Sequence, residues 1–152
     1  MEQKLASLNG RKTDSQKTVL VVDDNAENLI LVTKFLEADY HVLVANGGAD
    51  ALRRAQKYAG DIHLLLTDFE MPGMSGIDLA TRLTVDRPHI QVLLMSGFTQ
   101  GMLVLNEGWH FLPKPFVQSQ LQALVKGLVS PGQKSKFVGT GTQEQRASAG
   151  NE

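Results

Sequence analysis

Between Thr18 and Val129, short apolar runs alternate with stretches whose apolar residues recur every three or four positions. Runs rich in β-branched and apolar residues are typical of buried strands, and the three-to-four spacing is typical of helices. Strands separated by helices form right-handed crossovers, which build a parallel sheet covered on both faces. The sequence therefore predicts an α/β fold, a doubly wound (βα)5 sandwich, with strands at residues 18–22, 41–45, 62–67, 91–95 and 109–113.

The same spacing indicates where the helices lie. We expect the first helix to end near Asp39, a second to carry apolar residues between 51 and 59, a third between 77 and 83, and a last between 117 and 128. The connection between the fourth and fifth strands is rich in glycine, which disfavours helix. It has room for only a short helix around residues 100–105.

The length of 152 residues suits one domain and leaves no room for a second full-size domain. Residues 1–17 and 130–152 hold few apolar side chains and are rich in polar residues and glycine. Segments of this kind bury too little apolar surface to offset the entropy lost on ordering. We therefore expect a folded domain at residues 18–129 between a flexible N-terminal extension and a flexible C-terminal tail.

Composition excludes several functional classes. The chain has 15 basic and 16 acidic residues, for a net charge of −1, so we expect no direct binding to nucleic acid. It has no cysteine, which removes disulfides, thiolate catalysis and cysteine-based zinc sites. Its apolar runs are too short to cross a membrane, and its start lacks the apolar block of a signal peptide. The expected location is the cytoplasm.

Charged and polar residues follow four of the five predicted strands, at the point where each strand ends. Asp23 and Asp24 follow the first strand, Asp68 the third, Ser96 the fourth and Lys114 the fifth. In an open parallel sheet, the carboxyl ends of the strands share one edge, and ligands bind there. Each residue alone is better explained as a helix cap or a solvated loop residue, but four such coincidences together favour a site.

The chemistry of these groups points to phosphoryl transfer. Crowded carboxylates repel one another and are stabilised by a cation, and oxygen ligands without imidazole favour Mg²⁺. A carboxylate is also a nucleophile that forms an aspartyl phosphate. Phosphoryl transfer further requires a positive side chain, which Lys114 supplies, and Ser96 adds a hydroxyl donor. The residues therefore predict a Mg²⁺-dependent site that accepts a phosphoryl group on an aspartate.

The chain resembles the receiver domains of bacterial two-component response regulators, which the chemotaxis regulators exemplify. Four segments carry the resemblance, which covers residues 18–129. They are VLVVDD at 19–24, LLLTDFEMPGMSG at 64–76, LLMSG at 93–97 and FLPKPF at 111–116. The resemblance implies a flavodoxin-like five-stranded sheet with the strand order 2-1-3-4-5.

It also implies a role for each matching position. Asp68 matches the phospho-accepting aspartate, Lys114 the family's lysine, Ser96 the switch hydroxyl that bonds the phosphoryl group, and Phe111 the aromatic that changes rotamer with it. The implied Mg²⁺ ligands are the carboxylates of Asp23, Asp24 and Asp68 and the backbone carbonyl of Glu70. The bond between Lys114 and Pro115 is expected to be cis.

The resemblance further implies partners and a cycle. A histidine kinase or a histidine phosphotransfer protein donates the phosphoryl group, and a protein target reads the surface that switches. The chain is then not an enzyme in the usual sense, and it loses the phosphoryl group by slow intrinsic hydrolysis, at a rate that Glu70 and Phe98 tune. It is expected to be a monomer or a weak homodimer, either a free-standing regulator or the receiver of a hybrid histidine kinase.

Two other functions remain open at this point. Haloacid-dehalogenase-like phosphatases also combine an aspartate nucleophile with Mg²⁺, but they carry a second aspartate two residues later on the first strand. Here the second acid is Glu70, and the pair follows the third predicted strand. A pseudo-receiver that only binds partners is the other alternative, and the complete set of five site residues argues against it.

Overall fold

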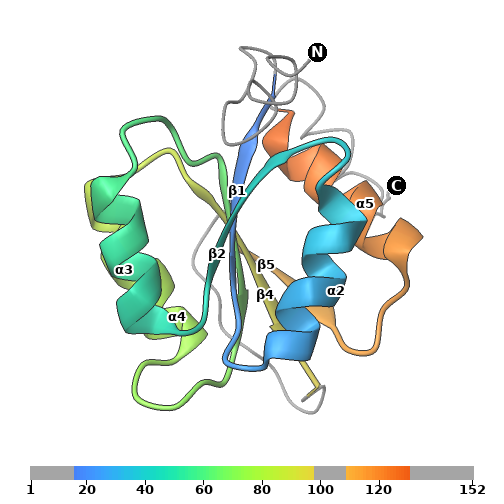
Figure 1. Ribbon diagram of the computed structural model, residues 1–152, viewed down its shortest axis with the longest axis horizontal. Helices are drawn as coiled ribbons and strands as arrows, with labels where there is room; N and C mark the ends of the chain where they lie inside the picture. The colour runs from blue at the N-terminus through green and yellow to red at the C-terminus, as the bar shows by residue number, and fades with distance from the viewer. Residues whose placement is uncertain (1–15, 98–108, 131–152) are drawn as a thin grey trace, which may run out of the picture.

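The computed structural model of the protein describes residues 16–97 and 109–130. In those ranges, strands and helices alternate along the chain up to Ser96, and the next described element is the strand that begins at Trp109 (Figure 1). Their bounds are β1 Thr18–Val22, α2 Ala26–Leu36, β2 His41–Ala45, α3 Gly48–Lys57, β3 Leu64–Asp68, α4 Gly76–Asp86, β4 Gln91–Ser96, β5 Trp109–Pro113 and α5 Gln118–Val129. The strands form one parallel sheet in the order β2-β1-β3-β4-β5. This confirms the predicted fold class and strand order.

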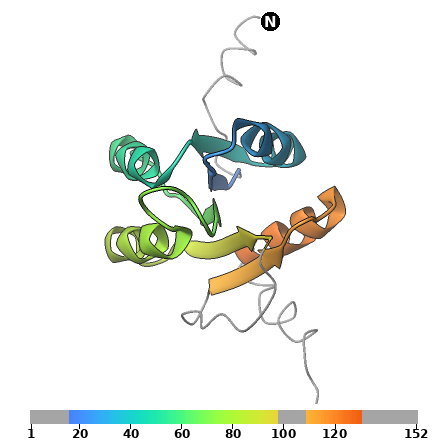
Figure 2. The same cartoon turned by 90° about the horizontal axis from the view of Figure 1, so that it is seen from below.

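The sheet lies between two layers of helices. Figure 2 shows α2 and α5 on one side of the strands and α3 and α4 on the other. Because successive side chains of a strand point to opposite faces, each central strand supplies both cores. Val19 and Val21 of β1 belong to the core under α2 and α5, and Leu20 and Val22 belong to the core under α3 and α4.

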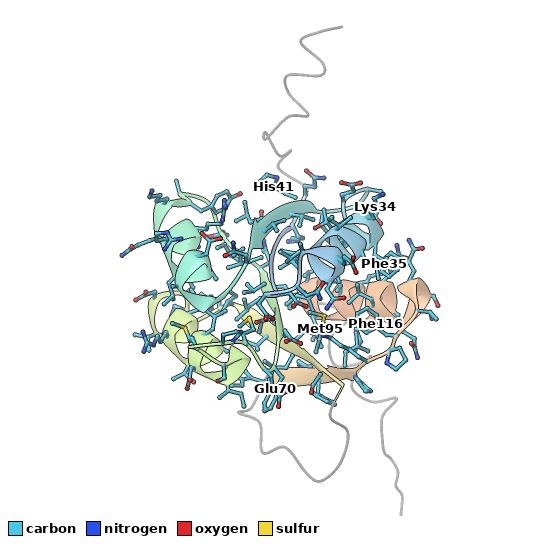
Figure 3. All side chains as sticks on the ribbon, turned by 60° about the horizontal axis from the view of Figure 1, so that its bottom comes forward. Lys34, Phe35, His41, Glu70, Met95 and Phe116 are labelled. Carbon is cyan, nitrogen blue, oxygen red and sulfur yellow. The ribbon has the colours of Figure 1, made fainter. Side chains whose placement is uncertain are left out.

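Burial explains why the central strands are continuous apolar runs in the sequence. Every residue of β1 and β3 is buried. A parallel sheet with helices on both faces leaves its inner strands no solvent side, so apolar and polar residues do not alternate there. Phe35 of α2 and Phe116, which precedes α5, pack against the same core and lie on the same side of the sheet in Figure 3.

Two strand bounds differ from the prediction. The third strand is Leu64–Asp68 rather than 62–67, because its pairing with β1 begins at Val19 and Leu64. Ile62 precedes this pairing although it is buried. Its apolar side chain extends the apolar run of the strand in the sequence, which is why the prediction included it. The fourth strand continues to Ser96, which is paired with Pro113 of β5.

The first two helices are shorter than predicted. Helix α2 ends at Leu36 rather than near Asp39. Helix α3 ends at Lys57, and Tyr58 is already extended, with φ −83° and ψ 118°. The guanidinium of Arg87 donates hydrogen bonds of 2.9 Å to the carbonyl oxygens of Ala55, Tyr58 and Gly60. These long-range contacts satisfy the end of α3 and could not be deduced from helical spacing.

The remaining predictions concern the bond before Pro115, the short helix, the two ends of the chain and membrane-spanning segments. The peptide bond between Lys114 and Pro115 is cis, as predicted. The short helix around residues 100–105 lies outside the described residues, as do nearly all of the two predicted extensions. Within residues 16–97 and 109–130, the structure has no helix with the length and apolar character needed to span a membrane.

Candidate functional site

Three acidic residues meet at the edge of the sheet formed by the carboxyl ends of the strands. This edge is at the bottom of Figure 1 and is turned forward in Figure 3. Asp23 and Asp24 directly follow β1, and Asp68 is the last residue of β3. Carboxylate oxygens of the three residues lie within 4.8 Å of one another. The structure thus brings together the acidic residues that the sequence predicted to converge.

Asp23 is the most enclosed member of this cluster, with 1% of its surface exposed. Its Oδ1 accepts a hydrogen bond of 3.0 Å from the backbone N–H of Asn25, and its Oδ2 accepts one of 3.2 Å from the side-chain amide of Asn28. Burial raises the pKa of Asp23, and the nearby charge of Asp68 adds to the rise. The hydrogen bonds and the charge of Lys114 oppose that rise without cancelling it. The environment of Asp23 therefore disfavours its charged form.

Lys114 is the cation that faces the cluster. Its Nζ lies 2.8 Å from Oδ1 of Asp68 and 3.8 Å from Oδ2 of Asp23. Its backbone N–H donates to the carbonyl oxygen of Ser96 at 2.8 Å, which continues the pairing of β4 with β5 up to the lysine. One lysine cannot neutralise three carboxylates, so the site retains a negative charge that favours a further cation.

The backbone around Asp68 is tightly held. The N–H of Phe69 donates to the carbonyl oxygen of Met95 at 2.7 Å, and the N–H of Gly76 donates to that of Phe69 at 2.9 Å. A Cβ at Gly76 would overlap the carbonyl oxygen of Asp68, so only glycine permits this approach. The connection from β3 to α4 therefore folds back on Asp68 and holds the backbone that carries its side chain.

Ser96 and Phe111 lie on the neighbouring strands β4 and β5. Ser96 is buried at the end of β4. Phe111 is paired with Leu94 in the middle of β5 and packs, partly buried, against the core under α3 and α4. Their switch roles stay predictions.

The structure describes one of the two residues expected to modulate the site. Glu70, labelled in Figure 3, follows β3 with an exposed side chain, and its carbonyl as a metal ligand stays a prediction. Phe98 lies outside the described residues.

The donor set fits a hard divalent cation. All three groups are carboxylates, and no imidazole or thiolate belongs to the cluster, which is the only such group in the described parts of the chain. Mg²⁺ prefers oxygen ligands and commonly takes one or two carboxylates while keeping several waters. The exposed Asp24 and the buried Asp23 and Asp68 therefore offer both a solvent-facing and an enclosed side to the ion.

Sequence reasoning missed three residues that shape this site. Asn25 and Asn28 hold the carboxylate of Asp23, and Gly76 allows the close packing on Asp68. Asn25 had a recognisable signal, because asparagine just before a helix is a common N-cap, and its side chain does accept from the N–H of Asn28. The contact of Asn28 with Asp23 had no such signal.

Comparison with known proteins places this chain in a family. The family model described as "Response regulator receiver domain" matches residues 19–126. The response regulator receiver protein CpdR of Brucella abortus (strain 2308) is 39% identical over 83 residues, which are 55% of this chain and 68% of that protein. Other curated relatives are longer: the chain spans 13% of a sensor kinase and 25% of a hydrogenase transcriptional regulator.

Solved structures agree with the family model. The receiver domain of the hybrid histidine kinase CckA is 32% identical with a TM-score of 0.67, and the match covers 74% of this chain and 99% of that one. The response regulator TrrA of Thermotoga maritima, solved in complex with Mg²⁺ and BeF, is 27% identical with a TM-score of 0.65, over 74% of this chain and 99% of that one. With the family model matching more than two thirds of its length, this chain belongs to the response regulator receiver domain family.

Proposed function

We propose that Asp68 accepts a phosphoryl group from a phosphohistidine of a histidine kinase or a histidine phosphotransfer protein. A carboxylate oxygen of Asp68 attacks the phosphorus in line with the P–N bond. As the new P–O bond forms, the electron pair of the P–N bond returns to the imidazole. The other ring nitrogen carries a proton, so the ring leaves as neutral imidazole. The product is an aspartyl phosphate on this chain and a free histidine on the partner.

A cation held by the acidic cluster would supply, together with Lys114, the positive charge that this reaction needs. Receiver domains bind Mg²⁺ in an acidic pocket, and here Asp23, Asp24, Asp68 and the carbonyl of Glu70 would hold it. When bound, the ion neutralises and orients phosphoryl oxygens. Lys114, whose Nζ already lies 2.8 Å from Asp68, would bond a further phosphoryl oxygen.

The proposed output is a change of protein surface. The hydroxyl of Ser96 would bond a phosphoryl oxygen, and Phe111 would change rotamer in concert. The two movements would favour one member of a pre-existing conformational equilibrium on the β4–β5–α5 side. A downstream protein, or the next member of a phosphorelay, would read that surface. In this proposal the chain would act in the cytoplasm as a monomer or weak homodimer.

The phosphoryl group would leave by hydrolysis. Water attacks the phosphorus, the bond to Asp68 breaks, and inorganic phosphate and the free carboxylate result. Glu70 and Phe98 would set how easily water reaches the phosphorus. The chain would thus release its phosphoryl group slowly and would not turn over external substrates.

A single observation carries this proposal. Three carboxylates from the ends of two strands lie within 4.8 Å of one another, and the one lysine that follows β5 bonds the carboxylate of Asp68. A structural ion pair requires one carboxylate and one lysine, whereas a phosphoryl site requires an excess of acidic ligands for a metal.

The test is phosphorylation by a small donor. With acetyl phosphate and Mg²⁺, the wild-type chain should take up one phosphoryl group per molecule in a bond that hydroxylamine cleaves. The Asp68→Asn variant should take up none. Asp61→Asn is the matched control, since Asp61 is an exposed aspartate outside the acidic cluster, and it should be labelled like the wild type.

Three outcomes would contradict the proposal. Label that persists in Asp68→Asn would place the phosphoryl group on another residue. Sustained hydrolysis of a phosphate monoester over many turnovers would identify a phosphatase, and a wild-type chain that takes up no label with Mg²⁺ would identify a pseudo-receiver.

A further inference from the structure

We infer that Asn28 is a positioning residue that holds the carboxylate of Asp23 ready for the cation. The inference rests on the proposed function, because it assigns a role in the metal site of that function. Asn28 lies in the first turn of α2, and its side-chain amide donates a hydrogen bond of 3.2 Å to Oδ2 of Asp23. A carboxylate only accepts hydrogen bonds, so the amide nitrogen must be the group that faces it.

The segment from Asp23 to Asn28 forms a small cradle around one carboxylate. The backbone N–H of Asn25 holds Oδ1 of Asp23, and the side chain of Asn28 holds Oδ2. The side-chain oxygen of Asn25 in turn accepts from the backbone N–H of Asn28 at 3.0 Å, which fixes the start of the helix. Both oxygens of Asp23 therefore have a donor before any cation arrives.

This arrangement matters because the last torsion of an aspartate side chain is soft. With a donor on each oxygen, the plane of the carboxylate is set by the protein. Lys114 fixes it less well, since its Nζ is 3.8 Å from Oδ2 and bonds Asp68 at 2.8 Å instead. Without Asn28, Asp23 would keep only the bond to Oδ1 and could rotate away from the direction in which the metal binds.

Partners that orient a metal ligand typically change metal affinity by tenfold or more. The bond from Asn25 survives the loss of Asn28, so the lower end of that range applies here. We expect Asn28→Ala to weaken Mg²⁺ binding by about tenfold. The loss should be in affinity alone, because Asn28 touches a ligand and not the reacting atoms.

Helix stability does not explain such an effect. Alanine is a better helix former than asparagine, so the replacement in α2 favours the helix. The first turn also keeps the cap from the side chain of Asn25, which bonds the backbone of residue 28. If the helix is at least as stable and Mg²⁺ still binds more weakly, the cause is the lost contact between residue 28 and Asp23.

The experiment measures the Mg²⁺ dissociation constant by calorimetry or by amide shifts in nuclear magnetic resonance, without a phosphoryl donor. Asn28→Ala and the size-matched Asn28→Leu should both bind about tenfold more weakly than the wild type. At saturating Mg²⁺, both should take up label from acetyl phosphate to the wild-type extent. This split between affinity and maximal extent is not expected from general damage to the fold.

Asn25→Ala is the matched control. It removes the helix cap but keeps the backbone N–H that bonds Asp23, so it should lower the melting temperature with a smaller effect on Mg²⁺ affinity. If both Asn28 variants bind Mg²⁺ within twofold of a wild type that binds and is labelled, the inference is wrong and the proposed function stands. Equal weakening by Asn25→Ala would also overturn it, because loosening of the helix start would then suffice. A wild type that binds no Mg²⁺ would overturn both.

Discussion

At the scale of single residues, the three carboxylates of the acidic cluster carry more charge than Lys114 balances. Asp23 and Asp68 are buried, and Lys114 is their one cationic partner among the described residues. Removing one partner of a buried ion pair leaves a charge that neither water nor protein stabilises. About a quarter of the Lys114 side chain is exposed, at 27%, so solvent screens part of this loss.

Lys114→Met should therefore destabilise the protein in the absence of divalent cations, by about 1–2 kcal/mol. The loss should shrink when Mg²⁺ is added, because the ion supplies charge to the same carboxylates. Chemical denaturation with and without Mg²⁺ measures both quantities. Lys126→Met, at an exposed lysine of α5, is the control and should change stability little. A loss in Lys114→Met that Mg²⁺ leaves untouched would contradict this account.

The raised pKa of Asp23 makes stability depend on pH. Burial is its main cause and the charge of Asp68 adds to it. A carboxyl group whose pKa is higher in the folded state destabilises the fold as pH rises from the ordinary value of 3.8 through the folded value. Below that window the group is protonated in both states and the penalty vanishes.

Asp23→Asn removes this penalty. In metal-free buffer, its stability relative to the wild type should be lowest below pH 3.8 and should increase as pH rises toward 7. Urea denaturation of both proteins across this pH range measures the difference. A relative stability that is flat or falls with pH would show that burial of Asp23 does not oppose its charge.

At the scale of elements, Arg87 joins parts of the fold that carry no chemistry. It follows α4, and its guanidinium bonds three carbonyl oxygens at and beyond the end of α3, each at 2.9 Å. Ala55 lies in the last turn of α3, where carbonyl oxygens lack an intrahelical donor, and a cation there also opposes the negative end of the helix dipole. Arg87 thereby ties α3 to α4 on the face away from α2 and α5.

Arg87→Ala should cost about 2 kcal/mol of stability, because hydrogen bonds to a charged donor are stronger than neutral ones. Arg87→Lys should recover only part of this, since an ammonium lacks the planar fork that reaches several carbonyls at once. Thermal denaturation compares both with Arg82→Ala, at an exposed arginine on the same helix. Phosphorylation of Asp68 should be retained in all three. A stable Arg87→Ala would mean that water replaces the guanidinium at these carbonyls.

The strands and helices also show which parts of the fold could be predicted from the sequence and which could not. Every strand could be located from the sequence, because burial on both faces leaves unbroken apolar runs such as β1. The sequence prediction extends α3 too far, since Tyr58 continues the helical spacing. The carbonyl oxygen of Tyr58 instead accepts from Arg87, 29 residues away, a contact that the spacing does not encode. Topology likewise predicted the meeting of Asp23 with Asp68. The contact from Asn28 depends on side-chain direction within one turn, which a pattern of residue types does not encode.

At the scale of the whole molecule, the acidic cluster draws on separate parts of the fold. Asp23 and Asp24 follow β1, Asp68 ends β3, and Lys114 follows β5. These residues are adjacent only when the sheet is assembled, so the unfolded chain holds no comparable site. A cation that binds only the folded state stabilises it by an amount set by its concentration and its dissociation constant.

Mg²⁺ should therefore raise the free energy of unfolding by about 2.7 kcal/mol at a concentration 100-fold above its dissociation constant. The increase should follow the logarithm of Mg²⁺ concentration beyond that constant, and it should be strongly reduced in Asp23→Asn/Asp24→Asn. Asp61→Asn is the control: Asp61 lines a cavity of about 1030 Å³ with Asp86, at the opposite edge of the sheet, and should respond like the wild type. If the double variant gains as much as the wild type, Mg²⁺ stabilises the fold from somewhere else, and the assembled cluster is not what couples the cation to folding.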